Sequence, residues 1–341
     1  MNVKRNELLN ALNSLSIGLA AKANLSQSDC FVFMGEYIIT FNDDIMVRVK
    51  SPVDIKAAVP ALELMGVLGK MPDDEIKFIH KGPEIVIKGK RRSAGITCES
   101  EIALPVESVP APGKWSRISE ETIQHLLQAS QTCGMDETQP LTFYVHITPR
   151  VIEACDNNRL FRVDGDNGLP GEVLLPGKPI GRISKMGVKR ISIGDGWVHF
   201  KTEGGAVITL RCSHEEYHRN IEDLFKLESP RKVVLPKGLL AAVGRAEIMS
   251  GDDALPQVSI SIANNEVVIT SRKMTGWYKE RSKVDYTDTP ISFDVHPEFI
   301  RDVLNKTRTV IIGSDRMSIK IDNIRFVVSL QLQKNDADQD E

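Results

Sequence analysis

Two histidines in the second half of the chain have the spacing of a zinc-binding motif. His214-Glu-Glu-Tyr-His218 matches His-Glu-x-x-His, in which a helix presents both histidines to zinc and the glutamate acts as general base. That site needs a helix of several turns and a distant third ligand. Here the motif directly follows a strand-like run at 206–212, and only 219–225 precede the linker at Ser229-Pro230. We therefore expect a polar turn and a short helix, and keep a zinc hydrolase as the less favoured alternative.

Other patterns with chemical potential are incomplete. Gly177-Lys178 is not followed by Ser or Thr, so the phosphate-binding loop is absent. Asp164-Gly-Asp-Asn-Gly168 begins like a calcium loop but lacks the closing Glu. We expect no catalytic residue, no metal and no cofactor. The cysteines stand singly, at Cys30, Cys98, Cys133, Cys155 and Cys212. Their scatter predicts reduced, mostly buried thiols in a cytoplasmic protein.

Length and composition predict a globular protein of several domains. At roughly 100–150 residues per domain, 341 residues correspond to two or three. Apolar residues make up 41% of the chain, and no apolar run approaches the length of a membrane span. The N-terminal segment contains Glu7, Asn10 and Asn13 at helical spacing, so we interpret it as part of the fold rather than as a signal peptide.

A helix signal recurs three times with a period near a third of the chain. Its apolar doublets, Leu8-Leu9, Leu126-Leu127 and Leu239-Leu240, are 118 and then 113 positions apart. Leu8, Leu12, Leu15 and Leu19 follow the spacing of one helix face. The pattern predicts helices over 6–19, 120–133 and 237–249.

A second signal, a short apolar run ending in proline and followed by a helix, also recurs three times. Its prolines are Pro60, Pro176 and Pro297, and proline suits a first helical turn because it lacks an N–H that would need a partner. Helices are predicted over 62–71, 180–186 and 299–306. Alternating residues after each helix predict strand pairs, and further strands are predicted after the first helices, at 30–33, 37–40, 141–147, 258–262 and 266–270.

Linker-like segments stand between the repeats, a proline-rich stretch at 105–114 and a polar one at 227–232. They predict three α+β domains over 1–112, 113–228 and 229–332, each with two helices packed on antiparallel sheets. Residues 333–341 form an acidic tail. Two unequal domains with chance similarity are the alternative.

Charge is unevenly distributed along the chain. The six helical segments with their flanks carry a net +7, although the whole chain has a net charge of −3. Basic helices on an acidic scaffold suit a surface that meets phosphates. Helix ends also favour Lys and Arg through the helix dipole, so charge alone leaves DNA contact open.

Five segments carry a resemblance to a known family. They are Glu153-Ala-Cys-Asp-Asn-Asn-Arg-Leu160, Glu172-Val-Leu-Leu-Pro176, Glu216-Tyr-His-Arg219, Phe299-Ile-Arg-Asp-Val-Leu-Asn305 and Phe326-Val-Val-Ser-Leu330. On these segments and the threefold repeat, the chain resembles the bacterial DNA polymerase III beta subunit, the beta sliding clamp, over nearly its full length, as a divergent member.

The resemblance implies a non-enzymatic processivity factor. Two copies would form a homodimeric ring that encloses double-stranded DNA without reading its sequence, each copy supplying half of the ring. Polymerase and clamp loader would bind through short linear peptides. The implied DNA contacts are Lys22, Lys178, Arg182 and Lys185. The implied dimer contacts are Ile248 and Met249. The implied peptide cleft, between the second and third domains, is lined by Leu141, Cys155, Arg159, Leu160, Tyr217, Arg219, Val327, Val328 and Leu330.

Departures from the family pattern affect the implied cleft. Cys155, Asn157 and Asn158 replace its Thr, Gly and His, and Ser329-Leu-Gln-Leu332 with an acidic tail replaces its terminal Met-Pro-Met-Arg-Leu. The partner peptide is therefore expected to differ from the usual one, as in a phage-encoded or otherwise specialised clamp. A monomeric clamp-fold interaction module is the other alternative.

Overall fold

The computed structural model describes residues 1–22, 25–136, 139–217, 221–251 and 256–332. Contacts divide the chain into two compact units, which we describe separately. Unit 1 comprises 1–131, 144–150 and 166–215, and unit 2 comprises 132–143, 151–165 and 216 onward. No helix in the described part of the chain is long and apolar enough to cross a bilayer.

The order of elements repeats three times. Each repeat runs strand, helix, four strands, helix, three strands, with α4 and β25 as the additions to this scheme. The predicted threefold repeat is confirmed. The helices are α1 (Arg5–Leu15), α2 (Ala61–Lys70), α3 (Glu120–Thr132), α4 (Pro140–Phe143), α5 (Gly177–Ile183), α6 (Leu239–Ala246) and α7 (Pro297–Lys306). Single 3-10 turns are η1 (Ser16–Gly18), η2 (Val106–Ser108), η3 (Ile221–Phe225) and η4 (Glu247–Met249).

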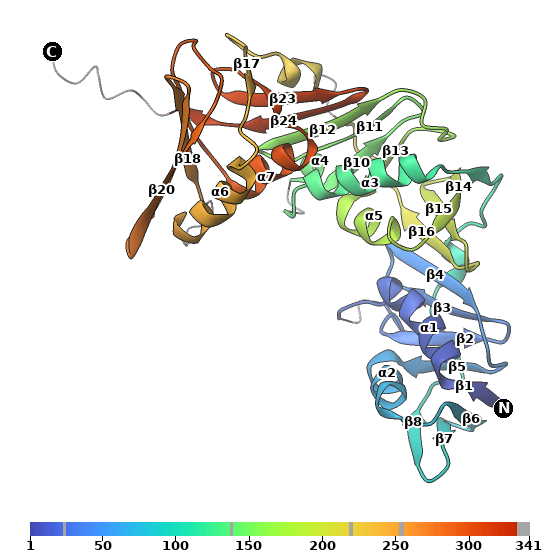
Figure 1. Ribbon diagram of the computed structural model, residues 1–341. Helices are drawn as coiled ribbons and strands as arrows, with labels where there is room; N and C mark the ends of the chain where they lie inside the picture. Colours follow the sequence, from blue (N-terminus) through green and yellow to red (C-terminus); the bar gives the residue numbers. More distant parts are fainter. Residues whose placement is uncertain (23–24, 137–138, 218–220, 252–255, 333–341) are drawn as a thin grey trace. The chain divides into compact units, whose positions relative to one another are not determined.

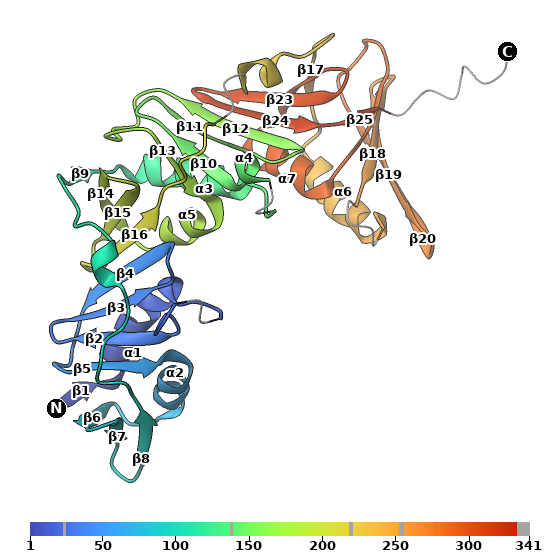
Figure 2. The ribbon, with the colours of Figure 1, turned by 180° about the vertical axis from the view of Figure 1, so that it is seen from behind.

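Unit 1 contains two complete antiparallel sheets and a strand pair (Figures 1 and 2). The four-stranded sheet has the order β1 (Asn2–Lys4), β6 (Glu75–Lys81), β7 (Glu84–Lys88), β8 (Ser93–Thr97). The eight-stranded sheet has the order β5 (Lys56–Pro60), β2 (Cys30–Met34), β3 (Tyr37–Phe41), β4 (Ile45–Lys50), β16 (Val207–Arg211), β15 (Trp197–Thr202), β14 (Val188–Gly194), β9 (Ser116–Arg117). The pair is β10 (Tyr144–Ile147) with β13 (Val173–Pro176). Strands of the first and second repeats thus share one sheet, through β4 and β16.

Unit 2 joins strands of the second and third repeats in the same way, through β12 and β24. In its first sheet, six strands lie side by side in the order β11 (Val151–Cys155), β12 (Arg159–Asp164), β24 (Ile324–Ser329), β23 (Arg316–Ile321), β22 (Thr309–Ile312), β17 (Arg231–Val234). The second sheet has the order β20 (Gly276–Lys283), β19 (Glu266–Lys273), β18 (Val258–Ala263), β21 (Ile291–Val295), β25 (Gln331–Leu332).

The helices bury the apolar stripes that the sequence predicts. Leu8, Leu12 and Leu15 of α1 are fully buried, because residues three and four apart share one helix face. In the second repeat, α5 approaches α3 closely at Gly181, where a Cβ atom would lie 2.8 Å from the Ser130 hydroxyl oxygen. A larger residue at 181 would require either rotation of the Ser130 side chain or separation of the two helices.

Most predicted elements are confirmed within a few residues at their ends. One expectation is wrong, and several strands, among them β4, β8, β12 and β20, were not predicted. Leu141 was predicted in a strand at 141–147, but α4 occupies Pro140–Phe143 and the strand begins at Tyr144. A proline at 140 fits a first helical turn and is a poor member of a strand ladder. Of the strands that were not predicted, the edge strand β20 alternates Trp, Lys and Arg with small or polar residues and therefore lacks the apolar face that would have indicated it.

Candidate functional site

An apolar row crosses three adjacent strands of unit 2. Cys155 pairs with Leu160, and Leu160 pairs with Val327 across β11, β12 and β24. Directly opposite residues of antiparallel strands point to the same side of the sheet, so these three side chains form one row. They are nearly fully buried and form a cluster with Ile221.

The apolar row is covered by Tyr217 and the turn η3, which together we call the covering segment. Tyr217 and Phe225 pack against the cluster at its margin. The Tyr217 hydroxyl donates to Sγ of Cys155 at 3.8 Å. Burial raises the pKa of Tyr217 and that of the Cys155 thiol, so both groups stay neutral at physiological pH.

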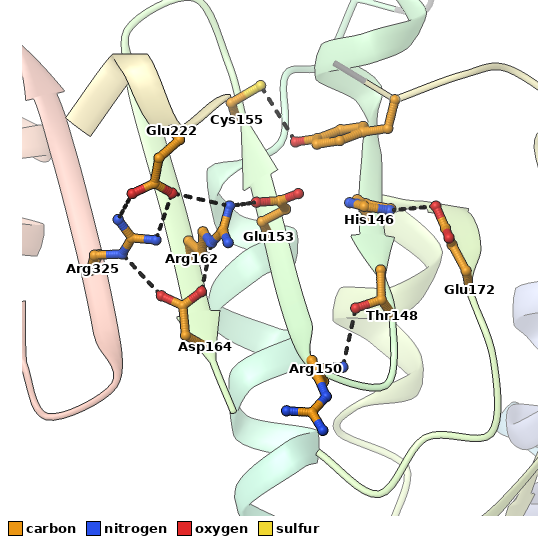
Figure 3. A network of polar contacts seen from close by, with 11 residues as sticks. His146, Thr148, Arg150, Glu153, Cys155, Arg162, Asp164, Glu172, Glu222 and Arg325 are labelled. Carbon is orange, nitrogen blue, oxygen red and sulfur yellow. Dashed lines mark hydrogen bonds and ion pairs between the residues drawn. The ribbon is translucent and has the colours of Figure 1, made fainter. Parts of the chain in front are cut away.

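An ionic network fixes η3 to the same face of the sheet (Figure 3). Arg325 holds Glu222 with two hydrogen bonds of 2.5 and 3.0 Å and lies over the ring of Phe225 at 4.2 Å. These hydrogen bonds from Arg325 lower the pKa of Glu222. Arg162 bonds the buried Glu153 at 3.2 Å and Asp164 at 2.8 Å. The covering segment is thereby held by paired charges as well as by apolar contact.

Arg159 lies on the opposite face of the sheet from the apolar row, because it neighbours Leu160 in β12. Its guanidinium bonds Asp156 at 3.1 Å and Asp302 of α7 at 3.0 Å, and it lies 4.4 Å from the centroid of the Phe299 ring. Phe299 in turn stacks on His296, with ring centroids 4.5 Å apart. Burial lowers the pKa of His296.

The predicted cleft residues therefore divide between two faces of one sheet. Cys155, Leu160, Tyr217 and Val327 share one face. Val328 pairs with Arg159 and shares the other, while Leu330 is buried beyond the end of β24. The side chain of Leu141 and the whole of Arg219 lie outside the described residues. The sequence analysis did not name Ile221, Phe225 or Phe299 as site residues. Ile221 and Phe225 follow the matched segment 216–219 as apolar residues, and Phe299 begins the matched segment 299–305, so their positions were a usable signal.

The predicted DNA contacts lie in unit 1 and are exposed. Lys178 and Arg182 are four residues apart in α5, on one helix face, and Lys185 follows the helix end. Lys22 is exposed near α1. None of the four forms an ion pair with another residue of the described ranges. Lys189 differs, because its Nζ lies 2.9 Å from Glu120 of α3; the acidic start of α3 is partly neutralised.

The predicted dimer contacts differ in exposure. Ile248 is 66% exposed in η4, and Met249 beside it is half-buried. In unit 1, a hollow lies between α2 and β8, with Pro60, Val67 and Ile96 in its lining. The strands β8 and β20 are the last in their respective sheets.

The histidine motif lacks the helix that zinc binding requires. His214 is exposed, and residues 214–217 are not helical. His218 lies outside the described residues. Within the described ranges, no three His, Cys, Asp or Glu side chains are grouped as metal ligands. Unit 1 contains a separate polar pair, in which Nε2 of His146 lies 3.1 Å from Oε1 of Glu172 (Figure 3). The glutamate side chain is exposed, whereas the histidine side chain is mostly buried.

Comparison with known proteins shows which fold this is. No protein-family model and no curated protein sequence matches the chain. Solved structures match it nearly end to end, and they define its fold as that of a DNA sliding clamp. More narrowly, several of them are DNA polymerase III beta subunits, including those of Thermotoga maritima and Bartonella birtlesii. The clamp of Bacillus subtilis is 14% identical, with 98% of this chain and 99% of that one covered and a TM-score of 0.82. That of Thermotoga maritima is 16% identical, with the same coverage and a TM-score of 0.80. That of Bartonella birtlesii, bound to griselimycin, is 17% identical, with 97% and 98% covered and a TM-score of 0.82.

Proposed function

We propose that this protein is a DNA sliding clamp, a non-catalytic ring that encloses duplex DNA and tethers a polymerase. The observation that carries the proposal is the threefold repeat of elements, which matches clamp structures over almost the whole chain. A role in replication would place the protein in the cytoplasm. The domain limits 1–112, 113–228 and 229–332 and the functional residues are part of this proposal.

The strand order supports the proposed closure of a ring. In each repeat, the four strands between the two helices form a series whose last member in sheet order is β4, β12 or β20. The strand before the first helix and the three strands after the second helix form another series, whose last member is β8, β16 or β24. Inside the chain, β4 pairs with β16 and β12 pairs with β24. The same rule leaves β20 and β8 as the two unpaired ends. If β20 of one copy pairs with β8 of another, a head-to-tail arrangement can close, and we propose that two copies close it.

The apolar contacts beside these edges fit that closure. Ile248 is exposed at the end of the helix that packs on β19 and β20. The hollow between α2 and β8 presents apolar side chains beside the other edge. We propose that Ile248 and Met249 of one copy enter this hollow on its partner, where burial of exposed apolar surface stabilises the joint.

The exposed cations are proposed to meet DNA phosphates. Lys22, Lys178, Arg182 and Lys185 lack ion-pair partners in the described ranges and supply positive charge without base-reading geometry. Contacts of this kind are independent of sequence and weaken with salt, as sliding requires.

The apolar row and its surroundings are proposed to bind the partner peptide. Apolar walls with a few placed polar groups suit a short linear peptide. The covering segment lies over the row, so we propose that the peptide displaces Tyr217 and inserts an apolar side chain against Leu160 and Val327. Griselimycin, bound to the clamps of Pseudomonas aeruginosa and Bartonella birtlesii, is a suitable probe.

Solution mass tests the ring. Light scattering across concentrations should give twice 37.9 kDa, and Ile248→Asp should give the monomer mass with an unchanged melting temperature. Met135→Asp, at a residue that is 76% exposed and belongs to none of η4, α2, β8 and β20, is the control and should stay dimeric. A wild-type monomer at every concentration would exclude enclosure by two copies and favour an interaction module.

A further inference from the structure

The hairpin of β19 and β20, whose edge strand is the proposed joint between copies, exposes an aromatic side chain to which the proposed function assigns no role. Trp277 is 65% exposed and Met274, in the adjoining turn, is fully exposed. Trp277 is the most exposed of the three tryptophans, since Trp197 is buried and Trp115 half-buried. An exposed Trp on a regular strand leaves a large apolar ring surface in water.

Three exposed cations continue the line of Trp277 along β20. Trp277, Lys279, Arg281 and Lys283 alternate with less exposed residues, so they share one face of the strand. We call this set the Trp277 stripe. Successive members are about 6.8 Å apart along the strand.

The neighbouring strand adds one more cation to this face. The register places Arg272 opposite Trp277 and Glu266 opposite Lys283. Glu266 is the one acid of β19 and β20 on this face, and it lies 3.3 Å from Arg281. The face of the two strands therefore carries a net charge of +3. Farther across the sheet, Asp294 of β21 also points to this side, by its register with Ser259.

Helix α6 packs on the other face of the hairpin. Tyr278 and Glu280 point to that face and hold Arg245 of α6, with Arg245 Nε 2.9 Å from the Tyr278 hydroxyl and Nη2 2.8 Å from Glu280 Oε1. The hairpin is thus fixed from behind while the Trp277 stripe stays open to solvent.

We propose that the Trp277 stripe binds single-stranded nucleic acid, with Trp277 stacking on a base and the cations facing successive phosphates. This combination of an exposed aromatic ring with evenly spaced positive charge is what sequence-independent single-strand binding uses. Lysines on an edge strand also discourage unwanted pairing, but that role does not account for an exposed Trp. The inference goes beyond enclosure of duplex DNA, because it assigns a second ligand to a different surface.

Tryptophan fluorescence with a 12-nucleotide oligo-dT probe tests the assignment. Stacking should quench the emission of Trp277, and the logarithm of affinity should fall with the logarithm of salt concentration, at a slope of about −2 for three phosphates. Trp277→Ala should weaken binding about 5- to 150-fold, measured by anisotropy of labelled oligo-dT. Lys279→Gln with Lys283→Gln should reduce the slope by about 1.4. Lys56→Gln with Lys77→Gln, two exposed lysines in unit 1, is the charge-matched control and should leave binding unchanged.

Three results would overturn the inference. The first is equal binding of poly-glutamate and oligo-dT without quenching, which would indicate a surface for acidic protein segments. The second is loss of the dimer mass in Trp277→Ala, which would assign Trp277 to the joint between copies. The third is full oligo-dT binding by Trp277→Ala and by the double lysine variant. Each is separable from failure of the clamp function, because oligo-dT binding needs no ring.

Discussion

The guanidinium of Arg159 lies 3.0 Å from the carboxylate of Asp302, and this contact joins β12 of the second repeat to α7 of the third. The arginine side chain is 9% exposed, whereas that of Asp302 is 38% exposed. Burial raises the pKa of Asp302, although the charge of Arg159 opposes the rise. Arg159 is therefore the more deeply buried member of the pair, and it also bonds Asp156.

This asymmetry predicts unequal effects of removing either partner. Arg159→Met should lower the free energy of unfolding by about 2–3 kcal/mol, because it leaves Asp302 half-buried without its cation and removes the contact with Phe299. Asp302→Asn should cost about 1 kcal/mol, since the amide can still accept a hydrogen bond. Urea titration checks both. An equal loss in the two variants would contradict the unequal burial.

Buried His199 predicts acid sensitivity. Its Nδ1 lies 2.9 Å from the Thr209 hydroxyl, while its Nε2 is buried without a hydrogen-bond partner in the described ranges. Burial, and then the charge of Arg48, lower the pKa of His199 to about 4 from 6.5. The unfolded chain takes up the proton first, so the contribution to stability is present above pH 6.5 and is lost as the pH falls toward 4.

The expected size of this loss is about 3 kcal/mol between pH 7 and pH 4. His199→Leu should remove that part of the pH dependence, whatever its stability at pH 7. Urea titrations at the two pH values, compared between wild type and variant, give the difference. His214→Leu, at an exposed histidine, is the control. Identical pH dependence in wild type and His199→Leu would show that His199 takes up no proton in this range.

The ionic network predicts which contacts hold η3. Glu153 is 4% exposed and Glu222 is 58% exposed at the side chain. Glu153→Gln should therefore lower stability by about 2 kcal/mol, because it leaves Arg162 with a weaker buried partner. Glu222→Gln should cost at most about 1 kcal/mol but should speed hydrogen exchange in Ile221–Phe225. An unchanged rate of hydrogen exchange in that turn would show that the apolar contacts alone hold η3 on the sheet.

The contact between Tyr217 and Cys155 predicts that the Cys155 thiol reacts slowly. The thiol is 6% exposed, and Tyr217 donates to it, so a disulfide reagent should react slowly with the folded protein. Tyr217→Ala should raise the rate at least tenfold by opening the cover. Tyr217→Phe keeps the ring and should change the rate little. Because the other thiols are also mostly buried, peptide mapping is needed to show which cysteine is labelled. Equal labelling rates of Cys155 in the wild type and both variants would contradict the claim that Tyr217 shields this thiol.

The exposed cations in α5 and just after its end predict the salt dependence of DNA binding. Changing Lys178, Arg182 and Lys185 to Gln should reduce the slope of log affinity against log salt by up to about 2.7 on duplex DNA. Lys189→Gln is the matched control, because Glu120 already neutralises Lys189. A larger effect at Lys189 than at the three free cations would contradict the proposed contact surface.

The sequence alone predicted the elements that depend on local pattern. Leu8, Leu12 and Leu15 define a helix face by spacing, and Pro60, Pro176 and Pro297 mark helix starts, so six helices and the threefold order were predictable. The joining of β4 to β16 and β12 to β24 was not, because such pairs depend on contacts between distant segments. The division of the cleft residues between two faces follows because neighbouring residues of a strand, such as Arg159 and Leu160, point to opposite faces. It could be derived only once Arg159–Asp164 is known to be a strand.

Retention on DNA tests enclosure most directly. A ring threads onto linear duplex DNA over its ends, and both ends are then blocked with streptavidin. The protein should stay on this DNA through a wash in 1 M salt, where phosphate contacts fail, and should leave after a single restriction cut between the blocks. Ile248→Asp, which should not close a ring, should wash off at once. Release of the wild-type protein by salt from the blocked, uncut DNA would contradict the account.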